Sequence, residues 1–199
     1  MDNFDLGQIC RSGQCFRMEQ TGENSYRVIA GDKYLELTQE KGIVNFFCPE
    51  EDFISFWIRY FDLDCDYQQY IEKINPRDKY LTEAVKLGNG IRILQQDLWE
   101  MIITFLISQQ NNITRIKRCI ENISREFGEK KISSNGAEYY AFPTPQSLSQ
   151  AGEEQLKACN LGYRAKYVLD TARKTASGEI SLNEIRNMKY KDARRELLN

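Results

Sequence analysis

The sequence contains no histidine, which excludes catalytic mechanisms that depend on a Ser-His or Cys-His pair. Its six cysteines include no Cys-x-x-Cys pair. A zinc site made of cysteine and histidine is therefore excluded, and the spacing of the cysteines disfavours an all-cysteine site. We expect reduced thiols that behave as small core hydrophobes, and no metal or organic cofactor.

Long hydrophobic runs are also missing. The longest one, Met101–Ile107, contains a threonine and is far too short to cross a bilayer. The N-terminus has neither the basic nor the apolar region of a secretory signal. These absences predict an intracellular protein without a membrane anchor, located in the nucleus of a eukaryote or in the cytoplasm or nucleoid of a prokaryote. At 199 residues the chain is long enough for one large domain or two small ones.

The net charge of −2 conceals an uneven distribution of charge. Residues 1–108 contain 11 Lys and Arg against 18 Asp and Glu, a net −7. Residues 109–199 contain 16 against 11, a net +5. Binding to a polyanion depends on the local field, so the second half is the candidate for contact with nucleic acid. Such asymmetry also occurs in ordinary enzymes and does not decide the function by itself.

Residues 14–48 have the alternating pattern of an antiparallel meander, with strands expected at 15–19, 26–30, 33–38 and 43–47. Gly31-Asp32 suits a two-residue type II′ turn between the second and third strands. From Pro49 onward the apolar spacing becomes helical, and it predicts helices near 50–62, 66–74 and 77–87.

The second half has the pattern of helices alone. Asp97 and Glu100 resemble a capping box before the run Met101–Ile107, and a helix that is apolar on every side should be buried on every side. A one-sided apolar pattern predicts a helix over 113–127 that ends at Gly128. Further helices are expected from Thr144, between Gly162 and Gly178, and from about residue 189.

Two helix starts carry unusual side chains. The first helix start contains four amides and a guanidinium, at Gln109, Gln110, Asn111, Asn112 and Arg115. Such side chains either cap a helix or form hydrogen bonds to base edges. Tyr163, Arg164 and Lys166 surround the second, although the helix dipole disfavours cations there. An exposed aromatic beside an arginine can fill a gap in stacked bases. The alternative is a tyrosine packed at a helix corner beside solvated cations.

Three ordered motifs together resemble the 8-oxoguanine DNA glycosylase family of the helix-hairpin-helix superfamily. They are Ser12-Gly13-Gln14-Cys15-Phe16-Arg17, Gln109-Gln110-Asn111-Asn112-Ile113-Thr114-Arg115-Ile116 and Leu161-Gly162-Tyr163-Arg164-Ala165-Lys166-Tyr167-Val168. The resemblance covers practically the whole chain. It implies an α+β fold with a TBP-like antiparallel-sheet domain over residues 1–94, followed by an all-helical glycosylase domain over 95–199 that lacks the helix-hairpin-helix.

The resemblance also implies roles for individual residues. The backbone carbonyl of Gly13 would accept the proton that 8-oxoguanine, but not guanine, carries on N7, and Phe105 would line the approach to the extruded nucleotide. Tyr163 would wedge into the duplex. Contacts to the orphaned cytosine or to DNA would come from Gln110, Asn111, Asn112, Arg115 and Arg164. Gln110 stands where animal members carry the first of three asparagines, and Asn112 is also the expected N-cap of its helix.

The implied activity is excision of 8-oxoguanine followed by strand incision, on double-stranded DNA with cytosine opposite the lesion, by a monomer. The family's catalytic lysine and aspartate are expected beyond Asn199, so the resemblance assigns no catalytic residue to this chain and predicts that the 199 residues alone are inactive. Two other classes remain open: a non-catalytic module that binds damaged DNA, and an interaction domain whose basic half binds something else.

Overall fold

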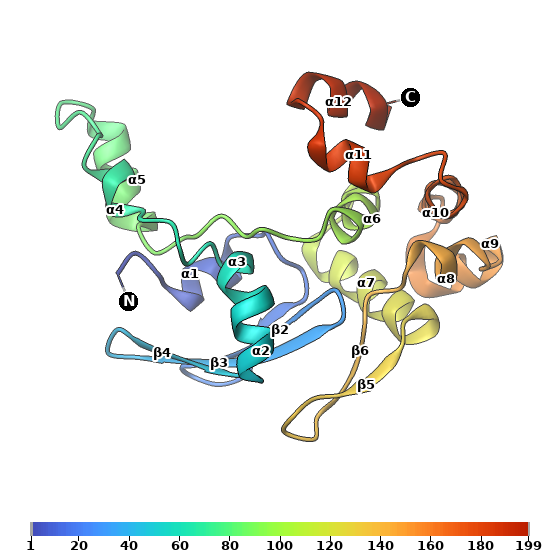
Figure 1. The fold of residues 1–199 in the computed structure, drawn as a ribbon, viewed down its shortest axis with the longest axis horizontal. Coiled ribbons are helices and arrows are strands. Elements are labelled where there is room, and N and C mark those ends of the chain that lie inside the picture. The colour runs from blue at the N-terminus through green and yellow to red at the C-terminus, as the bar shows by residue number, and fades with distance from the viewer. Residues whose placement is uncertain (1, 199) are drawn as a thin grey trace. The chain divides into compact units, whose positions relative to one another are not determined.

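The computed structural model describes residues 2–198, and the chain forms two compact units (Figure 1). The first comprises Met1–Gln96 together with Ile132–Ala137. The second comprises Asp97–Lys131 and Glu138–Asn199. One unit contains an antiparallel sheet and the other is mainly helical, so the α+β fold class is confirmed.

The sheet of the first unit is a four-stranded antiparallel meander, as the sequence predicts. Its strands, in spatial order, are β1 (Met18–Gln20), β2 (Ser25–Ala30), β3 (Lys33–Glu40) and β4 (Ile43–Phe47). Burial alternates along β2, where Tyr26, Val28 and Ala30 face the core. Gly31 has φ 57°, which fits the expected tight turn.

The first strand begins later than predicted. Residues 15–17 lie outside β1, because the chain before it turns at Gly13, with φ 78°, and Gln14 hydrogen-bonds to residues 92–96 instead of to β2. Pairing with β2 starts near Arg17, whose carbonyl accepts from the N–H of Ile29 at 3.1 Å.

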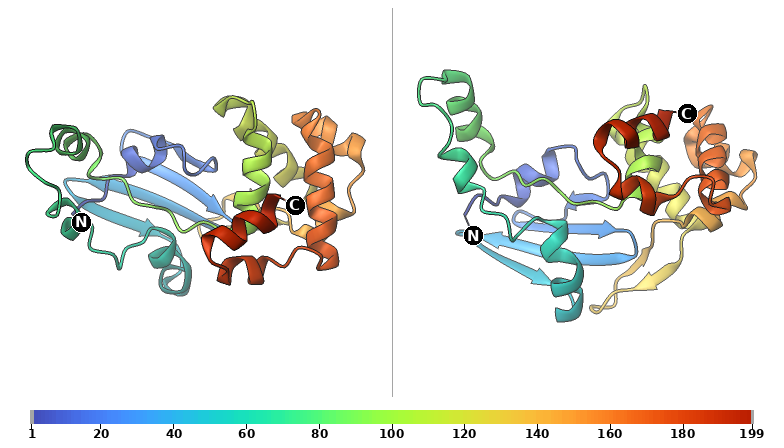
Figure 2. Two further views of the ribbon diagram at one scale, coloured as in Figure 1. Left: turned by 90° about the horizontal axis from the view of Figure 1, so that it is seen from above. Right: turned by 45° about the horizontal axis from the view of Figure 1, so that its top comes forward.

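A helical run over residues 50–60 lies against the sheet (Figures 1 and 2). It consists of α2 (Glu50–Asp52), a π-helical turn η1 (Phe53–Trp57) and α3 (Ile58–Tyr60). The other helices of this unit are α1 (Leu6–Arg11), α4 (Gln68–Ile71) and α5 (Lys79–Gly88). The hydrophobic core of this unit includes Phe4, Leu6, Ile9, Met18, Val28, Leu35, Leu37, Trp57, Tyr60, Phe61 and Leu94.

The second unit is mainly helical. In chain order, its helices are α6 (Leu98–Ser108), α7 (Ile113–Phe127), α8 (Pro145–Ser149), α9 (Glu153–Leu156), the π-helical turn η2 (Lys157–Leu161), α10 (Arg164–Ser177), α11 (Leu182–Asn187) and α12 (Tyr190–Leu198). The expected N-caps are present, because Asp97, Asn112 and Thr144 each accept from a backbone N–H three residues on. Helix α10 packs against α6, α8 and α9 (Figure 2).

Two local expectations for this half are wrong. The buried residues of helix α6 are Trp99, Glu100, Ile103 and Ile107, and the helix packs against α7, α10 and α11. Met101 and Phe105 are 45% and 66% exposed. The uniform hydrophobicity of a helix does not determine which of its faces the rest of the chain covers.

The second half of the chain is also not entirely helical, although its sequence pattern predicts helices alone. Strands β5 (Lys130–Ile132) and β6 (Glu138–Tyr140) form a hairpin. Its turn contains Asn135-Gly136, with φ 85° at the glycine, and the Ser133 hydroxyl accepts from the N–H of Ala137. An Asn-Gly pair is a hairpin signal, but strands of three residues are too short to show a period of two.

Within residues 2–198, no group of three or more His, Cys, Asp or Glu side chains is arranged to hold a metal ion. No helix among these residues has the length and hydropathy needed to cross a bilayer. The six cysteines are free thiols, three of them buried (Cys15, Cys119 and Cys159).

Candidate nucleic-acid interface

The loop between α6 and α7 ties its amides into the two helix ends. The Asn111 side chain donates to the carbonyl of Ile107 at 2.9 Å and accepts from the N–H of Asn112 at 3.0 Å. The Asn112 side chain accepts from the N–H of Arg115, so the predicted capping role of Asn112 is confirmed. Gln110 is different, because it has φ 48° and an exposed side chain.

The second candidate segment begins in the η2 turn, which the sequence pattern does not predict. Asn160 has φ 69° and Gly162 has φ 60° with ψ −133°. An L-residue is strained in this region, and asparagine and glycine tolerate it best. The chain therefore turns sharply at Gly162 and starts α10 at Arg164, as expected from the glycine.

Tyr163 and Arg164 do not fit the alternative of a packed tyrosine beside solvated cations. Tyr163 is 57% exposed, whereas Arg164 is only 4% exposed. The Arg164 guanidinium lies 4.5 Å from the centre of the Tyr163 ring, within cation–π range. The tyrosine ring is thus presented to solvent on top of a buried arginine.

Arg164 joins the two sequence motifs. Its Nε donates to the carbonyl of Gln109 at 2.9 Å, and its Nη2 donates to the carbonyls of Gln109 and Gln110. The planar fork of a guanidinium suits such paired acceptors. The unusual backbone at Gln110 is therefore held by a side chain that lies 54 positions further along the sequence.

Helix α7 supports the second segment through one stripe of side chains. Arg115 and Cys119 both contact the carbonyl of Asn160, at 3.4 and 3.3 Å, and Asn122 donates to the carbonyl of Cys159 at 3.4 Å. Positions i, i+4 and i+7 lie on one face of a helix, so a single face of α7 holds the turn before Gly162.

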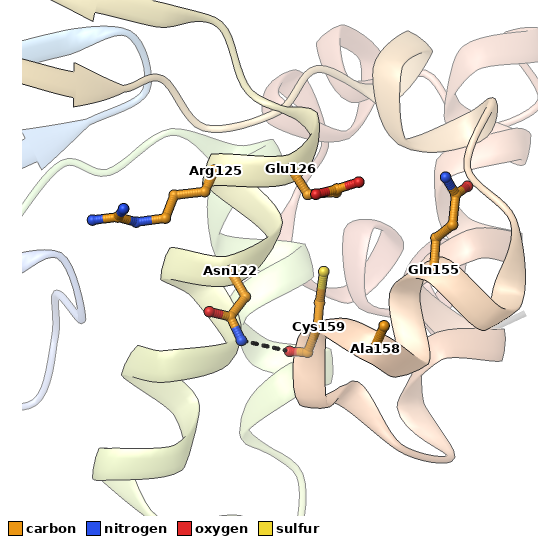
Figure 3. Close-up of a pocket in the computed structure, with 6 residues that line it drawn as sticks. All are labelled: Asn122, Arg125, Glu126, Gln155, Ala158 and Cys159. Carbon is orange, nitrogen blue, oxygen red and sulfur yellow. Dashed lines mark hydrogen bonds between the residues drawn. The ribbon is translucent and has the colours of Figure 1, made fainter.

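The same face borders an open pocket of about 390 Å³. Figure 3 shows Asn122 reaching the Cys159 carbonyl beside it. The pocket is lined by Asn122, Arg125, Glu126, Gln155, Ala158 and Cys159. Arg125 is already paired with Glu121, so it is not a spare cation for a ligand.

The electrostatics here favour a binding surface over a thiol nucleophile. Burial raises the pKa of the Cys119 thiol, although the guanidinium groups of Arg115 and Arg164 lower it. A raised pKa keeps the thiol protonated at neutral pH, and a protonated thiol is a poor nucleophile. Arg115 is exposed, and its Nη2 lies 3.7 Å from where a Cβ on Gly162 would be.

Within the second unit, the structure brings together Gln110, Asn111, Asn112, Arg115, Tyr163 and Arg164 through these contacts, and Phe105 lies one turn before the loop on the exposed side of α6. Gly13 belongs to the first unit, where it is exposed in a loop after α1. The supporting residues Asn160 and Asn122 were not predicted. The turn at Asn160 could have been predicted from the sequence, because asparagine and glycine are typical turn residues and Asn160 lies two positions before Gly162.

Comparison with known proteins first gives the class of the helical unit. Residues 103–196 match the model of the HhH-GPD superfamily of base excision DNA repair proteins. Residues 1–102 match the N-terminal domain of 8-oxoguanine DNA glycosylase. The chain belongs to the 8-oxoguanine DNA glycosylase family, and the resemblance inferred from the three motifs is confirmed.

Individual relatives agree. An N-glycosylase/DNA lyase of Saccharomyces cerevisiae is 32% identical over 89% of this chain and 51% of its own length. A probable N-glycosylase/DNA lyase of Methanothermobacter thermautotrophicus is 30% identical over 98% of this chain and 71% of its own. Among solved structures, the Clostridium acetobutylicum 8-oxoguanine glycosylase/lyase in complex with double-stranded DNA containing cytosine opposite 8-oxoG is 38% identical, with a TM-score of 0.92 over 99% of this chain and 68% of that one. The chain spans about half the length of the first curated relatives it matches.

Proposed function

We propose that the chain is the part of a base excision repair enzyme that contacts the lesion and the orphaned cytosine, with double-stranded DNA containing 8-oxoguanine opposite cytosine as its partner. The observation that carries this proposal is that Tyr163 and Arg164 contact the Gln109–Gln110 turn, while Arg115 contacts the carbonyl of Asn160 shortly before them in the chain. This arrangement supplies an exposed aromatic ring at Tyr163 and an exposed guanidinium at Arg115, with the buried Arg164 against the tyrosine ring. We further propose that residues 1–94 and 95–199 act as its two domains, inside the cell and as a monomer.

The surface suits the physical problem of base extrusion. Taking a base out of the stack costs a few kcal/mol, and contacts to the vacated site offset that cost. Tyr163 would fill the gap as a wedge, because a ring stacks on any base. The Arg115 side chain is exposed, and its guanidinium contacts the carbonyl of Asn160 at 3.4 Å and the thiol of Cys119, so in this proposal it turns toward the acceptors of an unpaired cytosine.

In this proposal Arg164 has a first task within the protein. Its donors are occupied by the carbonyls of Gln109 and Gln110, so it fixes the loop that presents the Gln110 amide. Contact with cytosine would use the part of the guanidinium that those carbonyls do not take.

The chemistry itself is proposed to need residues outside these 199. The family resemblance leads us to expect the catalytic lysine and aspartate beyond Asn199, and no lysine here stands in a matching sequence context. The chain alone is therefore expected to excise no base. Borohydride trapping on an 8-oxoguanine:cytosine duplex tests this, because a covalent adduct with the 199-residue chain would reveal an unforeseen nucleophile.

A second experiment separates repair from the other classes. The longest natural reading frame that contains this chain is incubated with duplexes carrying 8-oxoguanine or guanine opposite cytosine. Excision of 8-oxoguanine alone supports the proposal. Selective binding without excision would indicate a non-catalytic damage-binding module, and binding to neither duplex would indicate an interaction domain for another partner.

A further inference from the structure

The side-chain amide of Gln14 bonds to an extended segment of the first unit on both sides of Ile93. Its Oε1 accepts from the N–H of Leu94 at 3.0 Å, and its Nε2 donates to the carbonyl of Arg92 at 2.8 Å. The amide thus takes the place that a peptide group of a neighbouring strand would occupy. The Gln96 side chain adds a bond of 2.7 Å to the carbonyl of Gln14.

The segment that Gln14 bonds to is itself firmly held. Arg92 is 5% exposed and donates to the carbonyls of Asn3, Asp62 and Cys65 at 2.7 to 3.0 Å. Leu94 lies in the core. A side chain fixed on both sides of such a segment has little freedom left, so the backbone of Gln14 is fixed with it.

These bonds control the direction of the neighbouring carbonyl. The N–H of Gln14 is directed at the Ser12 hydroxyl, 3.4 Å away, and this hydroxyl donates to the carbonyl of Ile9 at 2.7 Å. The peptide bond between Gly13 and Gln14 is planar and trans, so its C=O points opposite to its N–H. Fixing the N–H therefore fixes the Gly13 carbonyl.

Gly13 needs this support. It is exposed and has φ 78°, a region that glycine alone visits freely and leaves as freely. Within residues 2–198 no hydrogen bond to the Gly13 carbonyl is formed, so only the adjoining residues set its direction.

We propose that Gln14 is a positioning residue for lesion selectivity. By fixing the Gly13 carbonyl, it allows this oxygen to accept the N7 proton of 8-oxoguanine and to repel the N7 lone pair of guanine. The inference rests on the proposed function and on the lesion-reading role of the Gly13 carbonyl that the family resemblance implies. In this proposal Gln14 acts through the Gly13 carbonyl and not through a contact with DNA of its own.

The test compares Gln14→Ala with Gln39→Ala in the full-length protein that contains this chain. Gln39 is the matched control because it makes the same kind of clamp: its Oε1 accepts from the N–H of Leu6 and its Nε2 donates to the carbonyl of Phe4, each at 2.7 Å. The melting temperatures of both variants are measured by thermal unfolding, to check that the two substitutions lower stability by similar amounts.

Dissociation constants are measured for duplexes with 8-oxoguanine, guanine or an abasic analogue opposite cytosine. Gln14→Ala is expected to lower the preference for 8-oxoguanine over guanine by roughly 5- to 10-fold, the scale of one hydrogen bond, and to leave abasic-site binding nearly unchanged. Gln39→Ala is expected to keep the preference. Equal weakening on all three duplexes by Gln14→Ala would overturn the proposal, since a purely structural role predicts that result.

Gln14→Glu adds a readout that a structural defect would not produce. The ionised carboxylate can accept from Leu94 but cannot donate to the Arg92 carbonyl, whereas the protonated acid can do both. The preference for 8-oxoguanine should therefore rise as the pH falls from about 6 to about 4, where a glutamate side chain takes up its proton, relative to the wild type. A flat ratio would contradict the proposal. A wild type that does not prefer 8-oxoguanine would refute the proposed function, and the inference with it.

Discussion

The Nε of Arg164 donates to the carbonyl of Gln109 at 2.9 Å, and the same oxygen also accepts from Nη2. Two segments that the sequence separates by more than fifty residues are thereby joined at one oxygen atom. The arginine is buried, so the bond forms where water does not compete well. This relationship means that Arg164 stabilises the loop whether or not it also touches DNA.

The first prediction follows from that burial. Arg164→Ala should lower the free energy of unfolding of the chain by about 2–3 kcal/mol, because hydrogen bonds from a charged donor are lost and carbonyls are left unpaired. Arg164→Lys should recover only part of the loss, since an ammonium lacks the fork. Urea denaturation with an unchanged m-value measures both. Arg173→Ala, on the exposed part of α10, serves as the control.

Arg115 allows base reading to be tested with little damage to the fold. It is exposed, and its guanidinium contacts the carbonyl of Asn160 at 3.4 Å and the Cys119 thiol. In the full-length protein, Arg115→Ala should reduce the preference for cytosine opposite the lesion by roughly 10-fold, the scale of a good base contact. Excision rates with each of the four bases opposite 8-oxoguanine measure it. If all four reactions slow equally, Arg115 is a phosphate contact only.

Tyr163→Ala should behave differently from the arginine variants. The exposed ring stacks without reading hydrogen bonds, so its removal should weaken binding by about 1–3 kcal/mol opposite every base alike. The same set of four duplexes gives the comparison, and Tyr163→Phe should retain most of the affinity. If Tyr163→Phe instead lost affinity only for the duplex with cytosine opposite the lesion, the tyrosine hydroxyl group would be reading that base.

The sequence was sufficient for those features that local chemistry determines. The meander, the caps at Asp97, Asn112 and Thr144, and the turn at Gly162 each depend on neighbouring residues. The helix α1 could have been found as well, since Asp5 accepts from the N–H of Gln8 in a recognisable capping pattern.

The contacts that could not be predicted from the sequence are those between residues far apart in the chain. Nothing in the neighbourhood of Arg164 indicates that its fork faces the carbonyl of Gln109, because backbone acceptors leave no trace in residue types. The exposure of Phe105 was missed for a similar reason, since it depends on which helices pack on α6. The site motifs were recognisable, but the contacts that hold them in place were not.

The last prediction concerns salt. The second half of the chain carries a net charge of +5 and the first half −7, so binding of the 199-residue chain to duplex DNA should come from the second half. Affinity should fall steeply with added salt, because each neutralised phosphate releases counterions.

Lys166 is exposed on α10, one turn from Tyr163. Lys166→Ala should reduce the slope of log K against log salt by about 1 and should weaken binding to all sequences alike. Lys79→Ala, on α5 of the acidic half, is the matched control and should change neither quantity. Titrations at several salt concentrations decide the matter, and a salt-independent affinity would indicate a partner other than a polyanion.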